Sequence, residues 1–244
     1  MHDSRLTTSP ASTQVLTADH EEHNPALLHH FADAKQQKNA ASLGMWLFLV
    51  TEIMFFGGMF CAYLIYRIKY FNAFAAGSQQ LDIKMGAFNT AVLIVSSVTV
   101  VLAVKAAEVG KRKLLVGYLV VTVLLGMTFL VVKGFEYREK FEKHHVPGPT
   151  FNFTEKFDDN GRQIPVNPKE AELFFSIYFA MTGMHALHMI IGCGLFGTLA
   201  VLAWKGHYSP TYFTPIENAG LYWHLVDIIW IYLFPLLYLI SRHS

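Results

Sequence analysis

Five long apolar segments constrain the fold of this chain more than any other feature. A helix needs about 20 mostly apolar residues to cross the hydrocarbon core of a membrane. Each segment is too long and too continuous for a barrel strand, and backbone polar groups in lipid must be bonded within the protein. We therefore predict an all-α polytopic membrane bundle with five transmembrane helices. The predicted spans cover residues 42–66, 87–104, 114–132, 173–204 and 221–240.

The composition agrees with a membrane protein. Of the 244 residues, 53% are hydrophobic and only 15% are charged, which is too apolar for an ordinary soluble domain. The formal net charge of +1 gives no reason to expect nucleic acid as a partner. Cys61 and Cys193 both lie in apolar segments and lack the spacing of a paired-cysteine metal site, so we interpret them as packing residues.

Two polar regions flank or interrupt the predicted spans. Residues 1–40 form a polar N-terminal tail without a signal-peptide core, and residues 41–244 form the membrane domain. A soluble insert over 136–169 is rich in turn-forming residues. Pro235 is expected to kink the last helix. Small residues predict close approach between helices, and they are Gly57, Gly58, Gly183, Gly192, Gly194 and Gly197.

The last span contains a histidine and a carboxylate, His224 and Asp227. A charged aspartate at the centre of a membrane helix costs about 2.5–3.5 kcal/mol, so such a group is expected to be paired, protonated or functional. Because the two residues are three apart, they share one face of a helix. We interpret them as interhelical polar contacts, and we expect Asp227→Ala to impair assembly.

Glu52 lies in the first span with apolar neighbours at the helical positions around it. Desolvation disfavours the charged form of such a carboxyl, so we expect a protonated or strongly hydrogen-bonded group. Two interpretations remain open, a proton-linked acid and a neutral acid that bonds a neighbouring helix. If the neutral form prevails, Glu52→Gln should preserve assembly.

His185 and His188 share a face of the fourth span because they are three residues apart. A metal site would need further ligands such as His224 or Asp227, and a haem site would need an axial histidine facing a cavity. We favour interhelical hydrogen bonding or lipid contact for both histidines, and we predict neither catalytic residues nor metal ligands in the chain.

Several residues near the span ends are expected to reach the membrane interface. Long charged side chains there can snorkel toward water, and tryptophan is enriched at the headgroup level. The residues concerned are Glu108, Lys133, Glu136, Trp46, Trp204 and Trp223.

Five short strings, one in or at the end of each span, resemble subunit III of the haem-copper respiratory oxidases. They occur in family order, so the resemblance runs from about residue 30 to the end. The strings are TEIMFFGG at 51–58, FNTAVL at 88–93, FEY at 135–137, TGMHALHMIIG at 182–192 and YWHLVDIIW at 222–230.

The resemblance implies a subunit without a redox centre in a proton-pumping terminal oxidase. Haems and copper would belong to partner subunits, with subunit I in direct contact, subunit II nearby, and subunit IV and a respiratory supercomplex as further partners. The family stabilises the catalytic subunit, supports proton uptake and binds phospholipid. The resemblance also implies a bacterial plasma membrane location, with the N-terminus cytoplasmic and the C-terminus periplasmic, whereas the charge distribution alone leaves orientation open.

The resemblance also carries residue-level expectations. Glu52 matches a buried glutamate of the family that reacts with carbodiimide and is not regarded as the pumping site. Lys205 occupies a position where many relatives place a basic residue against lipid phosphate. Glu136, His185, His188, His224 and Asp227 would form interhelical polar or lipid contacts. Longer family members have seven spans, and this chain lacks the first two, which form one wall of a lipid cleft.

Two alternatives come from other functional classes. A stand-alone proton-coupled transporter would use the intramembrane acids and histidines as a relay. A membrane haem protein would use His185 or His188 as an axial ligand. Copurification with a haem-containing subunit, transport by the lone chain and a Soret band of the lone chain would distinguish the three functions.

Overall fold

The computed structural model describes residues 34–148, 151, 153, 166–210 and 212–239. Five helical segments within this part of the chain are long and apolar enough to cross a membrane, and the same residues contain no β-strand. The predicted fold class is therefore confirmed. The elements are α1 (Ala34–Lys69), α2 (Phe71–Gln79), α3 (Ile83–Glu108), α4 (Arg112–Glu142), α5 (Pro168–Lys205), α6 (Thr214–Phe234) and a π-helical turn, η1 (Pro235–Leu239).

The helices extend beyond the predicted spans at nearly every end. Helix α1 begins at Ala34, inside the predicted tail, and the rest of that tail lies outside the described residues. Helix α4 continues to Glu142, so the first part of the predicted insert is helical, and residues 154–165 of the insert lie outside the described residues. Hydropathy locates the apolar centre of a helix, whereas polar turns continue it beyond the hydrocarbon.

Local sequence explains several helix ends. Asp82 caps α3, where its side chain accepts a hydrogen bond from Lys84 N at 2.8 Å. Asn167 caps α5 in the same way and is followed by Pro168, which is favoured in the first turn. Gly206 ends α5 with a φ of +85°, a left-handed conformation that favours glycine. At Pro235, the predicted site of a kink, the α-helix gives way to η1.

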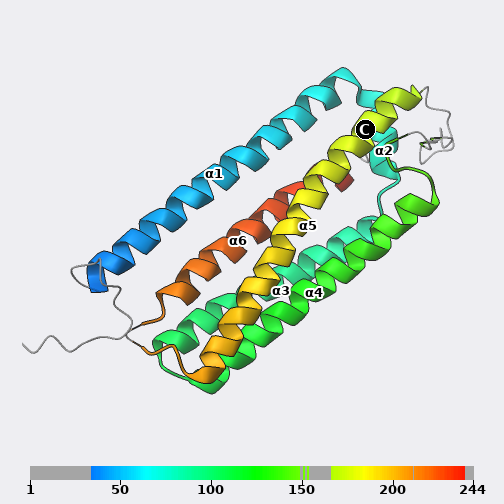
Figure 1. Ribbon diagram of the computed structural model, residues 1–244. Helices are drawn as coiled ribbons and strands as arrows, with labels where there is room; N and C mark the ends of the chain where they lie inside the picture. Colours follow the sequence, from blue (N-terminus) through cyan, green and yellow to red (C-terminus); the bar gives the residue numbers. More distant parts are fainter. Residues whose placement is uncertain (1–33, 149–150, 152, 154–165, 211, 240–244) are drawn as a thin grey trace, which may run out of the picture.

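Helix α1 lies along one side of the bundle that α3–α6 form (Figure 1). Only 17% of the residues in its most apolar stretch are buried, against 56% for the corresponding stretch of α6 and η1. Buried Phe56 and Tyr63 attach it to the bundle, and the Tyr63 hydroxyl donates to the Leu236 carbonyl at 2.9 Å. The remaining apolar surface of α1 is left for lipid or another protein.

The core is centred on two fully buried tryptophans, Trp223 and Trp230. The interfacial position expected for Trp223 is therefore wrong. A Cβ built on Gly192 would lie 2.9 Å from Trp223, which confirms close packing there, and one built on Gly126 would lie 2.7 Å from Cys193 Sγ. Among the described residues, the expectation of close approach is wrong for Gly57, Gly58, Gly194 and Gly197, where an added Cβ meets no neighbouring atom within 4 Å.

Candidate functional site

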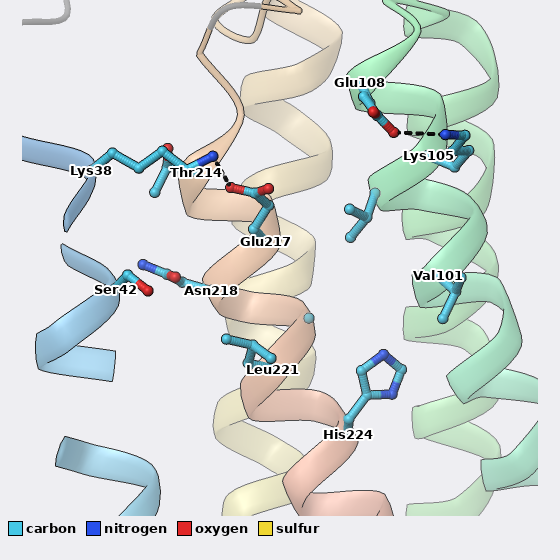
Figure 2. Close-up of a pocket in the computed structure, with 12 residues that line it drawn as sticks. Lys38, Ser42, Val101, Lys105, Glu108, Thr214, Glu217, Asn218, Leu221 and His224 are labelled. Atoms are coloured by element: carbon cyan, nitrogen blue, oxygen red, sulfur yellow. Dashed lines mark hydrogen bonds and ion pairs between the residues drawn. The ribbon is translucent and has the colours of Figure 1, made fainter. Parts of the chain in front are cut away.

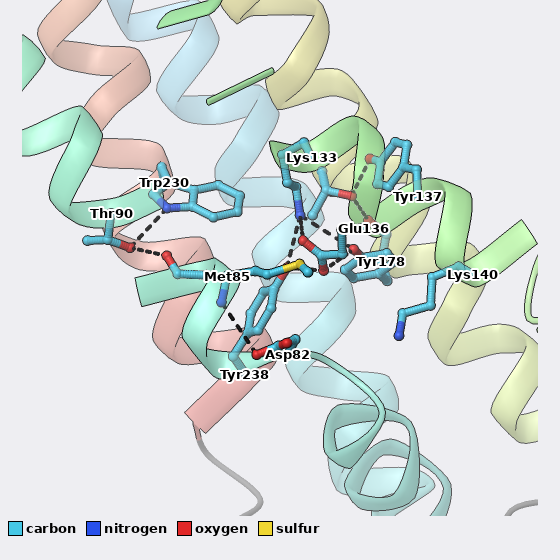
Figure 3. A network of polar contacts seen from close by, with 12 residues as sticks. Asp82, Met85, Thr90, Lys133, Glu136, Tyr137, Lys140, Tyr178, Trp230 and Tyr238 are labelled. Atoms are coloured by element: carbon cyan, nitrogen blue, oxygen red, sulfur yellow. Dashed lines mark hydrogen bonds and ion pairs between the residues drawn. The ribbon is translucent and has the colours of Figure 1, made fainter. Parts of the chain in front are cut away.

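A buried ion pair joins Lys133 and Glu136 on α4 (Figure 3). Lys133 Nζ lies 3.0 Å from Glu136 Oε2, and the side chains are 3% and 1% exposed. The hydroxyls of Tyr178 and Tyr238 donate to Glu136 Oε1 at 2.7 and 2.5 Å. Because these tyrosines belong to α5 and η1, one carboxylate connects three elements.

Aromatic rings complete the surroundings of Lys133. Its ammonium lies 4.8 Å from the centre of the Trp230 ring and also donates to the Tyr238 hydroxyl at 2.9 Å. A cation over an aromatic face is attracted by the ring quadrupole, most strongly where water is excluded. The snorkelling expected for Lys133 and Glu136 is therefore wrong, since both side chains point into the bundle.

Two neighbouring contacts extend this buried polar cluster. The hydroxyls of Tyr137 and Thr182 are 2.6 Å apart across α4 and α5. Lys140, only 1% exposed, donates to the carbonyl of Gln80 at the end of α2. The sequence signal for the cluster was a Lys–Glu pair three residues apart at the edge of an apolar segment, and the tyrosines carried no signal of their own.

Glu52 of α1 lies beside His188 of α5, with 3.1 Å between Oε2 and Nε2. His188 Nδ1 lies 2.8 Å from the carbonyl of Met184, and a carbonyl only accepts, so Nδ1 carries a proton. In a neutral imidazole, Nε2 is then an acceptor, and a hydrogen bond to Glu52 requires the proton of a carboxylic acid. An imidazolium would instead face a carboxylate. The two side chains are thus in contact, although Glu52 Oε2 makes no hydrogen bond of good geometry to the described residues.

Asp227 is buried, and neither of its carboxyl oxygens has a hydrogen-bond partner among the described residues. The Ser97 hydroxyl lies beside this carboxyl but bonds His224 Nδ1 at 2.7 Å. Neither His224 nor Asp227 makes a hydrogen bond to the histidines of the fourth span among the described residues. His224 instead joins α6 to α3.

The two histidines of α5 have different surroundings. His185 is fully buried against the rings of Phe129 and Trp230, and neither ring nitrogen has a hydrogen-bond partner among the described residues. It therefore does not make the expected interhelical hydrogen bond there.

Lys205 is exposed at the end of α5. Within the described residues, no group of three His, Cys, Asp or Glu side chains is placed to hold a metal ion.

A cavity of about 500 Å³ opens between α1, α3 and α6, at the end of the bundle where α6 begins (Figure 2). Two ion pairs lie at its rim, Lys38 with Glu217 at 3.0 Å and Lys105 with Glu108 at 2.9 Å. His224 lies deeper, beyond apolar lining residues that include Val101 and Leu221. A charged rim above an apolar interior suits an amphiphile.

The fold defines a polytopic α-helical membrane protein whose helices are joined by buried ion pairs and hydrogen bonds. The chain belongs to the cytochrome c oxidase subunit III family, whose pattern it matches over residues 27–155 and 170–242.

Individual relatives agree with this assignment. Cytochrome c oxidase subunit 3 of Synechocystis sp. is 32% identical over 97% of this chain and 90% of the relative. The protein of the same name from Corynebacterium diphtheriae is 31% identical over 85% and 92%. That of Gallus gallus is 29% identical over 80% of this chain and 67% of the relative, in keeping with longer family members. These matches do not favour the transporter or the haem protein.

Proposed function

We propose that the chain is a core subunit of a proton-pumping haem-copper terminal oxidase and stabilises the subunit that carries out the chemistry. The observation that supports this most is the family match, which extends through all five apolar helices. In this proposal the chain holds no redox centre, and the haems and copper belong to partner subunits.

The proposed arrangement places subunit I in direct contact with the apolar surface of the bundle. Subunit II, subunit IV and a larger respiratory assembly are further proposed partners. The membrane is a bacterial plasma membrane with the N-terminus in the cytoplasm. Because five spans separate the two ends, the C-terminus then faces the periplasm.

The intramembrane polar groups have a supporting role in this proposal. Glu136 fixes η1 and α5 to α4, Glu52 with His188 fixes α1 to α5, and His224 fixes α6 to α3. Such contacts give a bundle one defined packing against its partner. Bound phospholipid is the proposed non-protein component, and the amphipathic cavity of Figure 2 supports it.

Comparing the oxidase with and without this chain tests the proposal. Removing the chain from the purified complex should leave the initial rate of oxygen reduction largely intact and shorten the time over which activity survives turnover. Adding the chain back should restore that time. Equal decay of activity with and without the chain would overturn the stabilising role.

A further inference from the structure

A second, smaller cavity of about 410 Å³ lies where α4 begins and α5 ends. Its lining consists of Arg112, Lys113, Val116 and Trp204. Two cations therefore lie beside an aromatic ring and an aliphatic side chain at one end of two membrane spans. This combination of charge and apolar surface marks the boundary between headgroups and acyl chains.

Arg112 is fixed in place by the end of α5. Its Nε donates to the carbonyl of Ala203 at 3.0 Å, and Nη1 would lie 3.2 Å from a Cβ built on Gly206. Because Gly206 has no side chain, the guanidinium of Arg112 can pack directly against its backbone. The terminal nitrogens of Arg112 make no hydrogen bond to the described residues, so their donors remain available. A held guanidinium presents a planar fork of donors that matches phosphate oxygens.

The local charge balance favours an anion at this cavity. The cavity of Figure 2, at the same end of the bundle, is also lined by two cations. These are Lys38 and Lys105, and each is paired with a glutamate. Arg112 and Lys113 have no carboxylate partner among the described residues. Helix α4 also begins without a side-chain cap at Lys111, and a helix N-terminus favours negative charge.

Trp204 adds the apolar half of the site. It is 73% exposed on the last turn of α5, where a tryptophan is favoured at the headgroup level. Val116 lies one turn into α4 from Arg112, toward the membrane interior. An occupant with a negative head and an apolar tail would contact both halves at once.

We propose that this cavity binds the phosphate headgroup of an anionic phospholipid through Arg112 and Lys113, with the acyl chains along Val116 and Trp204. The site is distinct from the cavity of Figure 2 and does not use Lys205, which is outside its lining. It deepens the lipid-binding part of the proposed function. Its failure leaves the oxidase assignment intact, because copurification with a haem subunit is measured separately.

The test uses the full chain in nanodiscs with spin-labelled phosphatidylglycerol or phosphatidylcholine, and measures the immobilised fraction of each lipid. The wild type should prefer phosphatidylglycerol, and the Arg112→Gln, Lys113→Gln double variant should reduce that preference by up to about 30-fold. This magnitude is ~1 kcal/mol per cation near an anionic surface, converted at tenfold per 1.4 kcal/mol. Arg138→Gln, a basic residue paired with Glu142 at the other end of α4, should leave the preference unchanged.

Two further variants keep the test decisive. Because Arg112 also bonds Ala203, the double variant can misfold, and Lys113→Gln alone should then lower the preference by about fivefold. Lys113→Arg should retain it. An unchanged preference in a folded Lys113→Gln chain would overturn the proposal. So would Lys205→Gln causing the larger loss, or displacement of phosphatidylglycerol by millimolar inorganic phosphate, which would indicate a site for free phosphate.

Discussion

Lys133 and Glu136 are one turn apart on α4 and form an ion pair of 3.0 Å that is almost completely shielded from the surroundings of the bundle. Removing either charge leaves the other buried without compensation, which costs about 3–5 kcal/mol. Lys133→Met should therefore lower the midpoint of thermal unfolding sharply. Intrinsic tryptophan fluorescence of the purified chain measures this midpoint.

The double variant Lys133→Met, Glu136→Gln is the control for the ion pair. It removes both charges and leaves a glutamine to accept from Tyr178 and Tyr238. It should recover part of the stability lost in Lys133→Met. If the two single losses simply added, the residues would not interact as the geometry indicates.

Asp227 is buried among the described residues without a hydrogen-bond partner, which changes the expected effect of replacing it. Loss of assembly was expected because partners would be stranded, yet among the described residues the hydroxyl beside this carboxyl, that of Ser97, bonds His224 instead. An unsatisfied buried polar group costs about 1–3 kcal/mol, so Asp227→Leu should leave the melting temperature of the chain unchanged or raise it. Clear destabilisation by Asp227→Leu, with Asp227→Asn neutral, would show that the carboxyl is hydrogen-bonded after all.

Glu52 Oε2 lies 3.1 Å from His188 Nε2, and a protonated Glu52 would donate to this nitrogen, so a side chain that donates should replace the acid. The amide of Glu52→Gln can donate to Nε2, whereas Glu52→Leu leaves Nε2 without a partner. We expect Glu52→Gln to keep wild-type stability and Glu52→Leu to lose about 1 kcal/mol, the typical net value of one hydrogen bond. Denaturation monitored by circular dichroism compares them, and equal stability of the two variants would argue against the hydrogen bond.

Gly126 marks a contact that leaves no room for a side chain. A Cβ there would lie 2.7 Å from Cys193 Sγ and 2.8 Å from Trp223, so Gly126→Ala should destabilise the bundle by about 1–3 kcal/mol. Gly117 lies on the same helix, and a Cβ there meets no neighbouring atom of the described residues within 4 Å. Gly117→Ala should be neutral or stabilise by up to about 1 kcal/mol. Similar melting temperatures for the two variants would contradict the packing described around Trp223.

The number and type of the spans could be predicted from the sequence because lipid imposes a minimum apolar length on a helix. The positions of single residues could not, because an apolar helix has no polar face to show which side is inside. Gly192 and Gly194 look alike in sequence, yet only Gly192 faces Trp223. The direction of each side chain depends on how neighbouring helices pack.

The burial of the Lys133–Glu136 pair also could not be predicted from the sequence. Lys133 and Glu136 lie close to the end of an apolar segment, where snorkelling is the ordinary outcome for charged side chains. Their burial depends on Tyr178 and Tyr238, which are 45 and 105 residues away from Lys133 in sequence. No local pattern predicts these partners, whereas the three-residue spacing of the ion pair was visible.

Purification of the tagged chain from its native membrane in mild detergent tests the proposed function most directly. We predict that the chain copurifies in equal amount with a haem-containing catalytic subunit, so that the preparation shows a Soret band and reduces oxygen. Recovery of the chain alone, without haem, from membranes that retain their oxidase activity would contradict the account.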